Sequence, residues 1–327
     1  MDGPVVYFGQ SPNPVYSRIF CCPYNRLSGR GSLIMPVCLG DWLTWAAMRL
    51  ADERLADERG EYSLAEAVHA VRLATMQRLS ISKTQVLAHP EMPLTVQQLT
   101  LLEEALALLM RGEALPYVLG EWEFYGRLFT VTPYVLIPRP ETELMIEKAL
   151  VWAKDRPVQP IRAADVGTGS GCIAVTLALE LPDAEITAVD ISPTALQVAK
   201  ANGNRHDVQH RVHAVQGDLL SAFAPHSFDL ICANLPYIPS ERLADLAVAR
   251  REPRLALDGG PDGLALIGRL LPQVKRLLKP GGLALLEIDD THEDRALALG
   301  RQYFPDQAEI LRDYQDKPRM LKVSTGG

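Results

Sequence analysis

The chain has 327 residues, of which 47% are hydrophobic and 22% charged, and these proportions exclude an intrinsically disordered or a fibrous protein. Its 33 Lys and Arg residues against 40 Asp and Glu residues give a net charge of −7 without a dense basic run, so duplex nucleic acid is not expected as a partner. No uncharged apolar segment reaches the roughly 18 residues that a membrane helix needs, and the first residues lack the pattern of a signal peptide, which together predict a cytoplasmic protein without a membrane partner.

The cysteines do not indicate a metal or disulfide framework. They form no C-x-x-C pair and lie at Cys21, Cys22, Cys38, Cys172 and Cys232. We therefore expect free thiols in a reducing compartment, and no bound metal.

The first residues lack a regular pattern. Residues 1–34 are rich in Gly, Pro, Ser and Asn and show neither a helical nor an alternating period, which predicts an unstructured extension. Met35 is therefore a candidate for the natural start of the chain.

Residues 35–114 carry helical periodicity, which predicts a small helical domain. Apolar residues recur at helical spacing in three stretches, 41–58, 63–79 and 95–112. In the third stretch Gly112 is placed to end the helix as its C-cap. Its apolar side chains are expected to share one buried face, formed by Val96, Leu99, Leu102, Leu106 and Leu109.

Residues 115–138 are expected to form a β-hairpin that links two domains. β-Branched and aromatic residues flank a turn at Gly126, which is typical of two short antiparallel strands. Pro140 then suits the first turn of a helix, with Glu141 and Glu143 near the positive end of the helix dipole.

Residues 139–327 are expected to form an α/β domain, because strands and helices alternate from Ile161 onward. Alternation predicts a doubly wound, mostly parallel, seven-stranded sheet, whose last two strands form an antiparallel hairpin at one edge. We expect strands at 162–166, 185–190, 211–216, 228–234, 282–289, 308–313 and 319–324. We expect helices near 172–180, 193–202, 262–278 and 291–302.

A glycine-rich loop follows the first strand of this domain. It comprises Gly167, Thr168, Gly169, Ser170 and Gly171. Its G-x-G-x-G spacing differs from the G-x-G-x-x-G of dinucleotide folds and favours S-adenosylmethionine as the bound molecule. Asp190 ends the second strand, where its carboxylate can accept hydrogen bonds from ribose hydroxyls. Asp218 ends the third strand and could accept from an adenine amino group, with Leu219 packing on the ring.

The fourth strand ends in the motif Asn234, Leu235, Pro236 and Tyr237. The amide oxygen of Asn234 and the carbonyl of Leu235 can each accept one N–H of a planar amide or amino group, which aligns that nitrogen with the methyl donor. Asn234 would then contact both the cofactor and the target, while the ring of Tyr237 could stack on the target. An isolated Asn-x-Pro-Tyr run is more often a turn, but here it follows a methyl-donor fold.

The order of seven motifs resembles the PrmC/HemK family of protein-glutamine N5-methyltransferases, from Trp42 onward. These motifs read "LGEWEFYG", "LIPRPETE", "DVGTGSG", "VDIS", "NLPYI", "REPRLALDGGPDG" and "LKPGG". The resemblance implies a Rossmann-like S-adenosylmethionine-dependent methyltransferase domain behind a helical substrate-recognition domain. It also implies, as substrate, the glutamine of the Gly-Gly-Gln loop in peptide chain release factors.

Residue by residue, the resemblance places the family's cofactor loop on Gly167 to Gly171, its ribose acid on Asp190 and its amide-holding motif on Asn234 to Tyr237. The family motif reads Asn-Pro-Pro-Tyr, so Leu235 is a departure. Leu235 still precedes Pro236, which keeps it extended and preserves its carbonyl, so we expect an effect on rate rather than on chemistry.

Other targets remain open on sequence alone. The catalytic motif does not separate a release factor from a ribosomal protein, and Asn-Pro-Pro-Tyr sites also methylate amino groups of flipped nucleic-acid bases. The acidic charge disfavours nucleic acid, and a chain that binds cofactor without transferring methyl groups is the least favoured reading. We expect a monomer that acts on release factors. His206, His210 and His213 could suggest a metal, but they lack supporting carboxylates or thiolates and are expected to be solvated.

Overall fold

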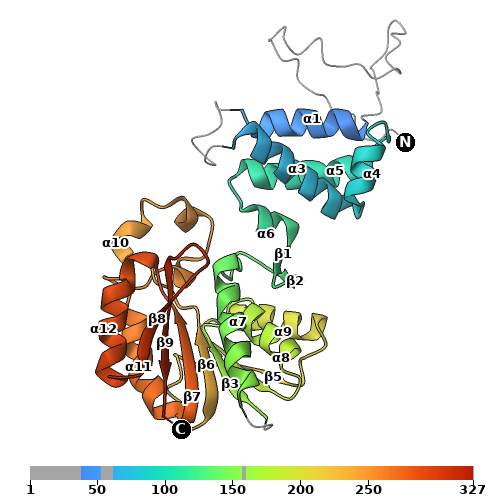
Figure 1. The fold of residues 1–327 in the computed structure, drawn as a ribbon. Helices are drawn as coiled ribbons and strands as arrows, with labels where there is room; N and C mark the ends of the chain where they lie inside the picture. The colour runs from blue at the N-terminus through green and yellow to red at the C-terminus, as the bar shows by residue number, and fades with distance from the viewer. Residues whose placement is uncertain (1–37, 53–61, 157–159, 327) are drawn as a thin grey trace, which may run out of the picture. The chain divides into compact units, whose positions relative to one another are not determined.

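The computed structural model describes residues 38–52, 62–156 and 160–326. It divides the chain into two compact units, Met1–Gly112 and Glu113–Gly327 (Figure 1). The predicted extension at residues 1–34 lies outside the described residues, as do Met35 and the second half of the first predicted helix.

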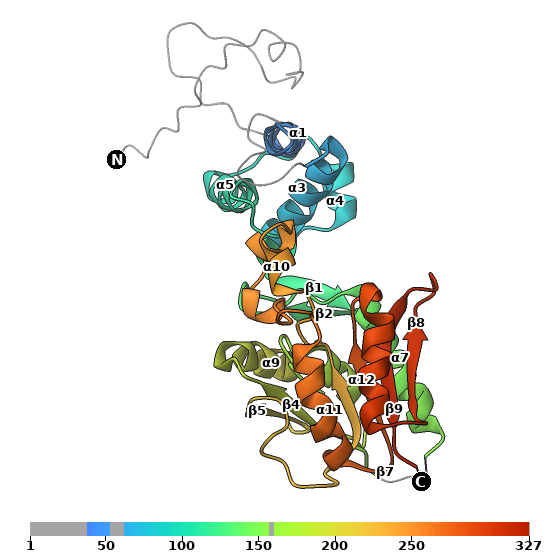
Figure 2. The same cartoon turned by 90° about the vertical axis from the view of Figure 1, so that its left-hand side faces the viewer.

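The described part of the first unit is helical, as its periodicity predicts (Figure 2). Serine or threonine precedes three of these helices and accepts a hydrogen bond from the backbone three residues later, while a Glu or Gln side chain returns the bond. Such capping boxes satisfy N–H groups that the first turn leaves free. The helices are α1 (Leu39–Leu50), α3 (Leu64–Leu79), α4 (Lys83–Ala88) and α5 (Val96–Met110).

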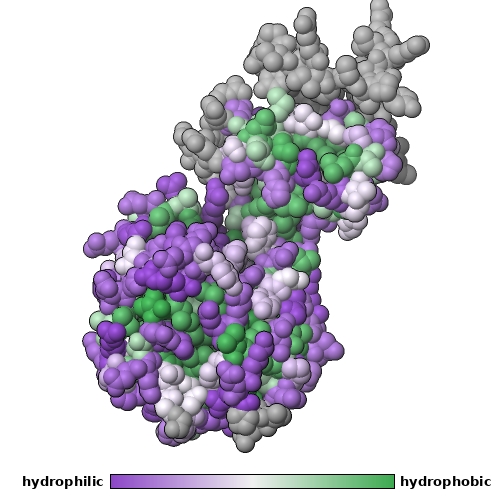
Figure 3. Space-filling view, in the orientation of Figure 1, coloured by the Kyte–Doolittle hydropathy of each residue, from purple (hydrophilic) through white to green (hydrophobic). Residues whose placement is uncertain are grey.

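The core of the first unit forms where these helices meet. Leu39 and Leu50 from α1 and Leu102 and Leu109 from α5 are fully buried. The expectation that Val96 shares this buried face is wrong, because Val96 is the first residue of α5 and is 71% exposed. Other large apolar side chains are also exposed on this unit, whose surface shows apolar areas in Figure 3, including Leu64 and Leu87 at 57% each.

The second unit contains the seven-stranded sheet, in the order β5-β4-β3-β6-β7-β9-β8. The first five strands in this order are parallel, and β9 pairs antiparallel with both β7 and β8. This confirms the predicted fold class, including the antiparallel hairpin at one edge. The strands are β3 (Arg162–Val166), β4 (Glu185–Asp190), β5 (Val212–Gln216), β6 (Phe228–Ala233), β7 (Leu278–Glu287), β8 (Ala308–Arg312) and β9 (Pro318–Ser324).

Helices cover both faces of this sheet, so its central strands are buried on two sides and read as continuous apolar runs (Figure 1). One hydrophobic core lies between the sheet and α7 and α8, and the other lies between the sheet and α11 and α12. The helices of this unit are α6 (Leu115–Leu119), α7 (Pro140–Lys154), α8 (Cys172–Glu180), α9 (Pro193–Arg205), α10 (Ser240–Leu243), α11 (Ala265–Leu277) and α12 (Glu293–Tyr303), with 3₁₀ turns η3 (Ala247–Arg250), η4 (Arg254–Ala256) and η5 (Asp290–His292).

A hairpin is present within the predicted segment as β1 (Glu121–Phe124) and β2 (Arg127–Thr130), which pair antiparallel around a turn at Gly126, whereas residues 115–119 of that segment form α6. Phe124 and Phe129 point from the two strands into the core beside α7 and meet edge to face. Asn202 in α9 fixes β2 by accepting from the N–H of Thr130 and donating to its carbonyl. The hairpin is therefore packed into the second unit.

Three cysteines lie in the part of the chain that the structure describes. Cys38, Cys172 and Cys232 are buried and form no disulfide there. Among the described residues, every helix is too short or too polar to span a lipid bilayer.

Candidate functional site

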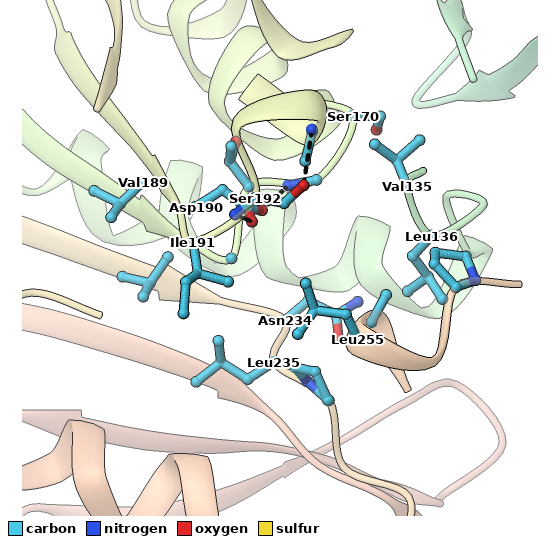
Figure 4. Close-up of a pocket in the computed structure, with 18 of the residues that line it drawn as sticks. Val135, Leu136, Ser170, Val189, Asp190, Ile191, Ser192, Asn234, Leu235 and Leu255 are labelled. Carbon is cyan, nitrogen blue, oxygen red and sulfur yellow. Dashed lines mark hydrogen bonds between the residues drawn. The ribbon is translucent and has the colours of Figure 1, made fainter. Parts of the chain in front are cut away.

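A cavity of about 560 Å³ opens at the carboxyl ends of the parallel strands. Val166 and Asp190 line it at the ends of β3 and β4, and Asn234 lines it directly after β6. Figure 4 labels Asp190 and Asn234 on this cavity. Open α/β sheets bind ligands at this edge, and the volume lies within the range of small-molecule sites. The cavity is therefore the candidate active site.

The glycine-rich loop forms one wall of the cavity. Gly167, Thr168, Gly169 and Ser170 line it. Gly167 and Gly169 have φ values of 73° and 54°, a backbone conformation that side chains disfavour. Asp165, buried at the end of β3, fixes the loop because its Oδ2 accepts from the Thr168 hydroxyl at 2.6 Å and from the N–H of Ala174 at 3.1 Å.

Gly171 does not line the cavity, although the sequence places it in the cofactor loop. It is the N-cap of α8, and a Cβ atom there would lie 3.0 Å from the Cβ of Ala199 in α9. Gly171 therefore allows α8 and α9 to pack closely, which is a structural requirement beside the site.

Asp190 lies across from Asn234 in the cavity (Figure 4). Its Oδ2 accepts from the N–H of Gly169 and its Oδ1 from the N–H of Ser192, both at 2.9 Å. Each carboxylate oxygen retains a lone pair for a further donor. Asp190 thus holds the glycine-rich loop and the loop after β4 in one geometry.

Asp218 and Leu219 also line the cavity, after β5. Asp218 is half exposed and pairs with the guanidinium of Arg269 from α11. Leu219 is buried and has a φ of 54°. Both residues therefore lie on the cavity together with Arg269, which no motif in the sequence indicates.

Asn234, Leu235 and Pro236 line the cavity beside the glycine-rich loop. The Asn234 Nδ2 donates to the Thr142 hydroxyl at 3.0 Å. The Leu235 side chain is 5% exposed and lies against Gly167, where a Cβ atom would be 2.9 Å from its Cδ2. Leu235 therefore contributes a side-chain surface to the cavity as well as a backbone carbonyl.

Tyr237 does not line the cavity. Burial raises the pKa of its phenol, and the negative charge of Glu287 raises that pKa further. The stacking of its ring on the target therefore stays a prediction.

Two segments without an assigned role complete the cavity. One runs from Tyr134 to Arg139 after the hairpin, and the other includes residues 253–256. The buried Glu252 joins them, because it accepts from the N–H of Ile137 at 3.1 Å and pairs with Arg139. In the sequence, the "REPRLALDGGPDG" run is the signal for the second segment. Its contact with the first segment has no local signal, because Glu252 and Arg139 are more than a hundred residues apart.

The three histidines form no metal-binding cluster in the part of the chain that the structure describes. His206 packs on the ring of Phe129 and its Nε2 contacts the Leu128 carbonyl at 3.0 Å. His213 pairs with Glu185 across neighbouring strands, and His210 is exposed. None of the three lines the cavity.

Two buried carboxyl groups flank the site. Burial raises the pKa of Glu287, at the end of β7, to about 7, against opposing hydrogen bonds from Thr142 and Tyr237 and the charge of Arg319. Burial likewise raises the pKa of Asp165 to about 7. Ionising either group in the folded protein is therefore unfavourable relative to the unfolded chain.

We expect the free energy of unfolding to fall as the pH rises from about 4.5 to 7. In this window folded Glu287 holds a proton that the unfolded residue releases, and the raised pKa corresponds to a loss of about 3 kcal/mol. Glu287→Gln should make the free energy of unfolding less dependent on pH in this window. Part of the dependence should remain, because the raised pKa of Asp165 acts in the same direction. Urea denaturation at several pH values measures this, with exposed Glu309→Gln as control. An unchanged slope in Glu287→Gln would contradict the expectation.

Two family models match the chain. A PrmC N-terminal domain matches residues 41–120, and a Methyltransferase small domain matches residues 148–251. The second match contains the glycine-rich loop, Asp190 and Asn234.

Proteins named release factor glutamine methyltransferase align with most of the chain. The one from Koribacter versatilis is 46% identical over 256 residues, which are 77% of this chain and 89% of that protein. The one from Moorella thermoacetica is 44% identical over 64% of this chain and 74% of its own. The one from Chlorobaculum tepidum is 39% identical over 74% of this chain and 85% of its own.

Proposed function

Because the chain belongs to the release factor glutamine methyltransferase family, we propose that it transfers a methyl group from S-adenosylmethionine to a glutamine side chain of peptide chain release factors. The target is the amide nitrogen, N5, of the glutamine in the Gly-Gly-Gln motif. The observation that carries this proposal is the placement of Asn234 and the glycine-rich loop on one cavity.

The residues of the cavity fit S-adenosylmethionine. The glycine-rich loop exposes backbone to the cavity, and Asp190 retains acceptor capacity for ribose hydroxyls. Asp218 and Leu219 line the same cavity, and we assign them to the adenine ring. When bound, S-adenosylmethionine supplies an electrophilic methyl group on a sulfonium. This chemistry needs no metal.

The side chain of Asn234 compensates for the low reactivity of the nitrogen that accepts the methyl group. An amide nitrogen is a poor nucleophile because its lone pair is delocalised, and methylation builds positive charge on it. The Nδ2 of Asn234 is held by Thr142, which leaves Oδ1 to accept an N–H of the target. Together with the Leu235 carbonyl, Oδ1 orients the nitrogen and stabilises the developing charge.

We propose that the protein acts as a monomer in the cytoplasm, where release factors act. The net charge of −7 supports a protein substrate over duplex nucleic acid.

The test supplies radiolabelled S-adenosylmethionine with a release factor, with ribosomal proteins or with RNA and DNA, and maps the label by mass spectrometry. We expect label on the Gly-Gly-Gln glutamine of the release factor, and none when that glutamine is replaced by alanine. Label confined to a ribosomal protein or to a nucleic acid would overturn the assignment of the substrate.

We expect a fragment that begins at Leu115 to bind S-adenosylmethionine like the full chain but to lose most turnover on a folded release factor. All cavity residues lie in the second unit, so the cofactor site is retained. The first unit, with exposed apolar residues such as Leu64 and Val96, is then available to bind the protein substrate. Calorimetry and steady-state kinetics measure the two effects. Full turnover by the fragment would show that the helical unit does not select the substrate.

A further inference from the structure

Buried polar side chains connect Asn234 to the core of the second unit. The Asn234 Nδ2 donates to the Thr142 Oγ1 at 3.0 Å, and the Thr142 hydroxyl donates to the Glu287 Oε2 at 2.7 Å. Thr142 is 2% exposed and Glu287 is 3% exposed. Burying such groups costs free energy, so a fully bonded arrangement across three elements indicates a specific role.

Thr142 is free to bond outside its own helix because of its position. Helical threonines commonly donate to the carbonyl four residues earlier, as Thr75 does to Val71 at 2.8 Å. Thr142 lies in the first turn of α7, where no preceding turn offers such a carbonyl. Its hydroxyl instead bridges the end of β6 and the end of β7.

The direction of these hydrogen bonds decides which way the Asn234 amide faces. A hydroxyl has one hydrogen to donate, and Thr142 donates it to the Glu287 Oε2, which accepts whether or not the other oxygen of that carboxyl group carries a proton. The Thr142 oxygen can then only accept from Asn234, which draws Nδ2 toward Thr142 and leaves Oδ1 for the target. The opposite amide orientation would place two N–H donors against the N–H groups of the target.

On the basis of the proposed function, we propose that Thr142 and Glu287 are positioning residues that fix the Asn234 amide in its accepting orientation. Glu287 acts through Thr142 on the asparagine of the motif. Neither Thr142 nor Glu287 touches the reacting atoms.

The kinetic test uses Thr142→Val, which keeps the shape of the side chain and removes the hydroxyl. We expect kcat to fall about tenfold, the scale of one lost hydrogen bond, with the Kd for S-adenosylmethionine unchanged. Thr142→Ser restores the hydroxyl and should restore kcat. The matched control is Thr176→Val, because Thr176 is buried and its hydroxyl has no hydrogen-bond partner among the described residues.

A spectroscopic test is independent of the substrate. Asparagine occurs only at Asn13, Asn25, Asn202, Asn204 and Asn234, so selective ¹⁵N labelling gives five side-chain amide pairs. Asn234→Ala identifies the pair of interest. We expect Thr142→Val and Glu287→Gln to shift the Asn234 signals, and Thr142→Ser to return them toward wild type. The Asn202 signals should not move, because its Nδ2 donates to the carbonyls of Thr130 and Ser170.

The two tests separate this inference from the proposed function. If wild-type protein fails to methylate release factors but the Asn234 signals respond as expected, the positioning role stands and the substrate assignment falls. If wild-type protein methylates release factors and Thr142→Val retains wild-type kcat, the positioning role is overturned. Unmoved Asn234 signals in Thr142→Val would also overturn it.

Discussion

Asn234→Ala is expected to reduce kcat by a factor of about 100 or more, because a preorganised acceptor of the target N–H is lost. The Asn234 Oδ1 is the side-chain oxygen left for the target once Thr142 has bound Nδ2. The Kd for S-adenosylmethionine should change little, since the glycine-rich loop and Asp190 remain. Steady-state kinetics on a release factor and calorimetry with the cofactor separate the two effects.

The control for this variant is Asn204→Ala. Asn204 is exposed on α9 and does not line the cavity, so its removal should leave kcat unchanged. If Asn234→Ala retained more than about a tenth of wild-type kcat, the Asn234 amide would have no role in the methyl-transfer step.

Asp190→Ala is expected to weaken S-adenosylmethionine binding tenfold or more. Two charge-assisted bonds to ribose would be lost, each worth about 1.5–3 kcal/mol. The same change releases the N–H groups of Gly169 and Ser192, so the loops on both sides of the ribose lose their common anchor. Isothermal titration calorimetry measures the Kd directly.

Asp190→Asn separates the loss of the ribose hydrogen bonds from the release of the two loops. It keeps one acceptor oxygen of similar geometry, so its Kd should fall between those of wild type and Asp190→Ala. Asp183→Ala is the control, because Asp183 is exposed just before β4, at the opposite end of that strand. Unchanged affinity in Asp190→Ala would exclude Asp190 from the cofactor site.

The sequence predicts the sheet well because its signals are local and repeated. Central strands such as β6 are buried along their whole length and appear as uninterrupted apolar runs. Turn and loop residues then place the motifs at the strand ends. Short helices such as α4 and α6 were not predicted, since five or six residues are too few to show a helical period.

The connections between motifs could not be predicted in the same way. Thr142 and Glu287 are 145 residues apart, and Thr142 and Asn234 are 92 residues apart. In the sequence, Thr142 is part of an ordinary helix start and Glu287 is the end of an apolar strand. The sequence predicts a role for the backbone of Leu235 alone, whereas its side chain packs on Gly167. Such contacts depend on tertiary packing, which no local pattern encodes.

The position of β9 has a consequence for biosynthesis. β9 is the last strand in chain order but lies inside the sheet, between β7 and β8. Before residues 318–324 have left the ribosome, the edge of β7 in the nascent chain is therefore unpaired, and β8 has no strand with which to pair. Unpaired strand edges favour aggregation, and pairings of this kind form late. We expect nascent chains stalled before β9 to remain open to proteases and chaperones, although their glycine-rich loop and Asn234 have already been synthesised.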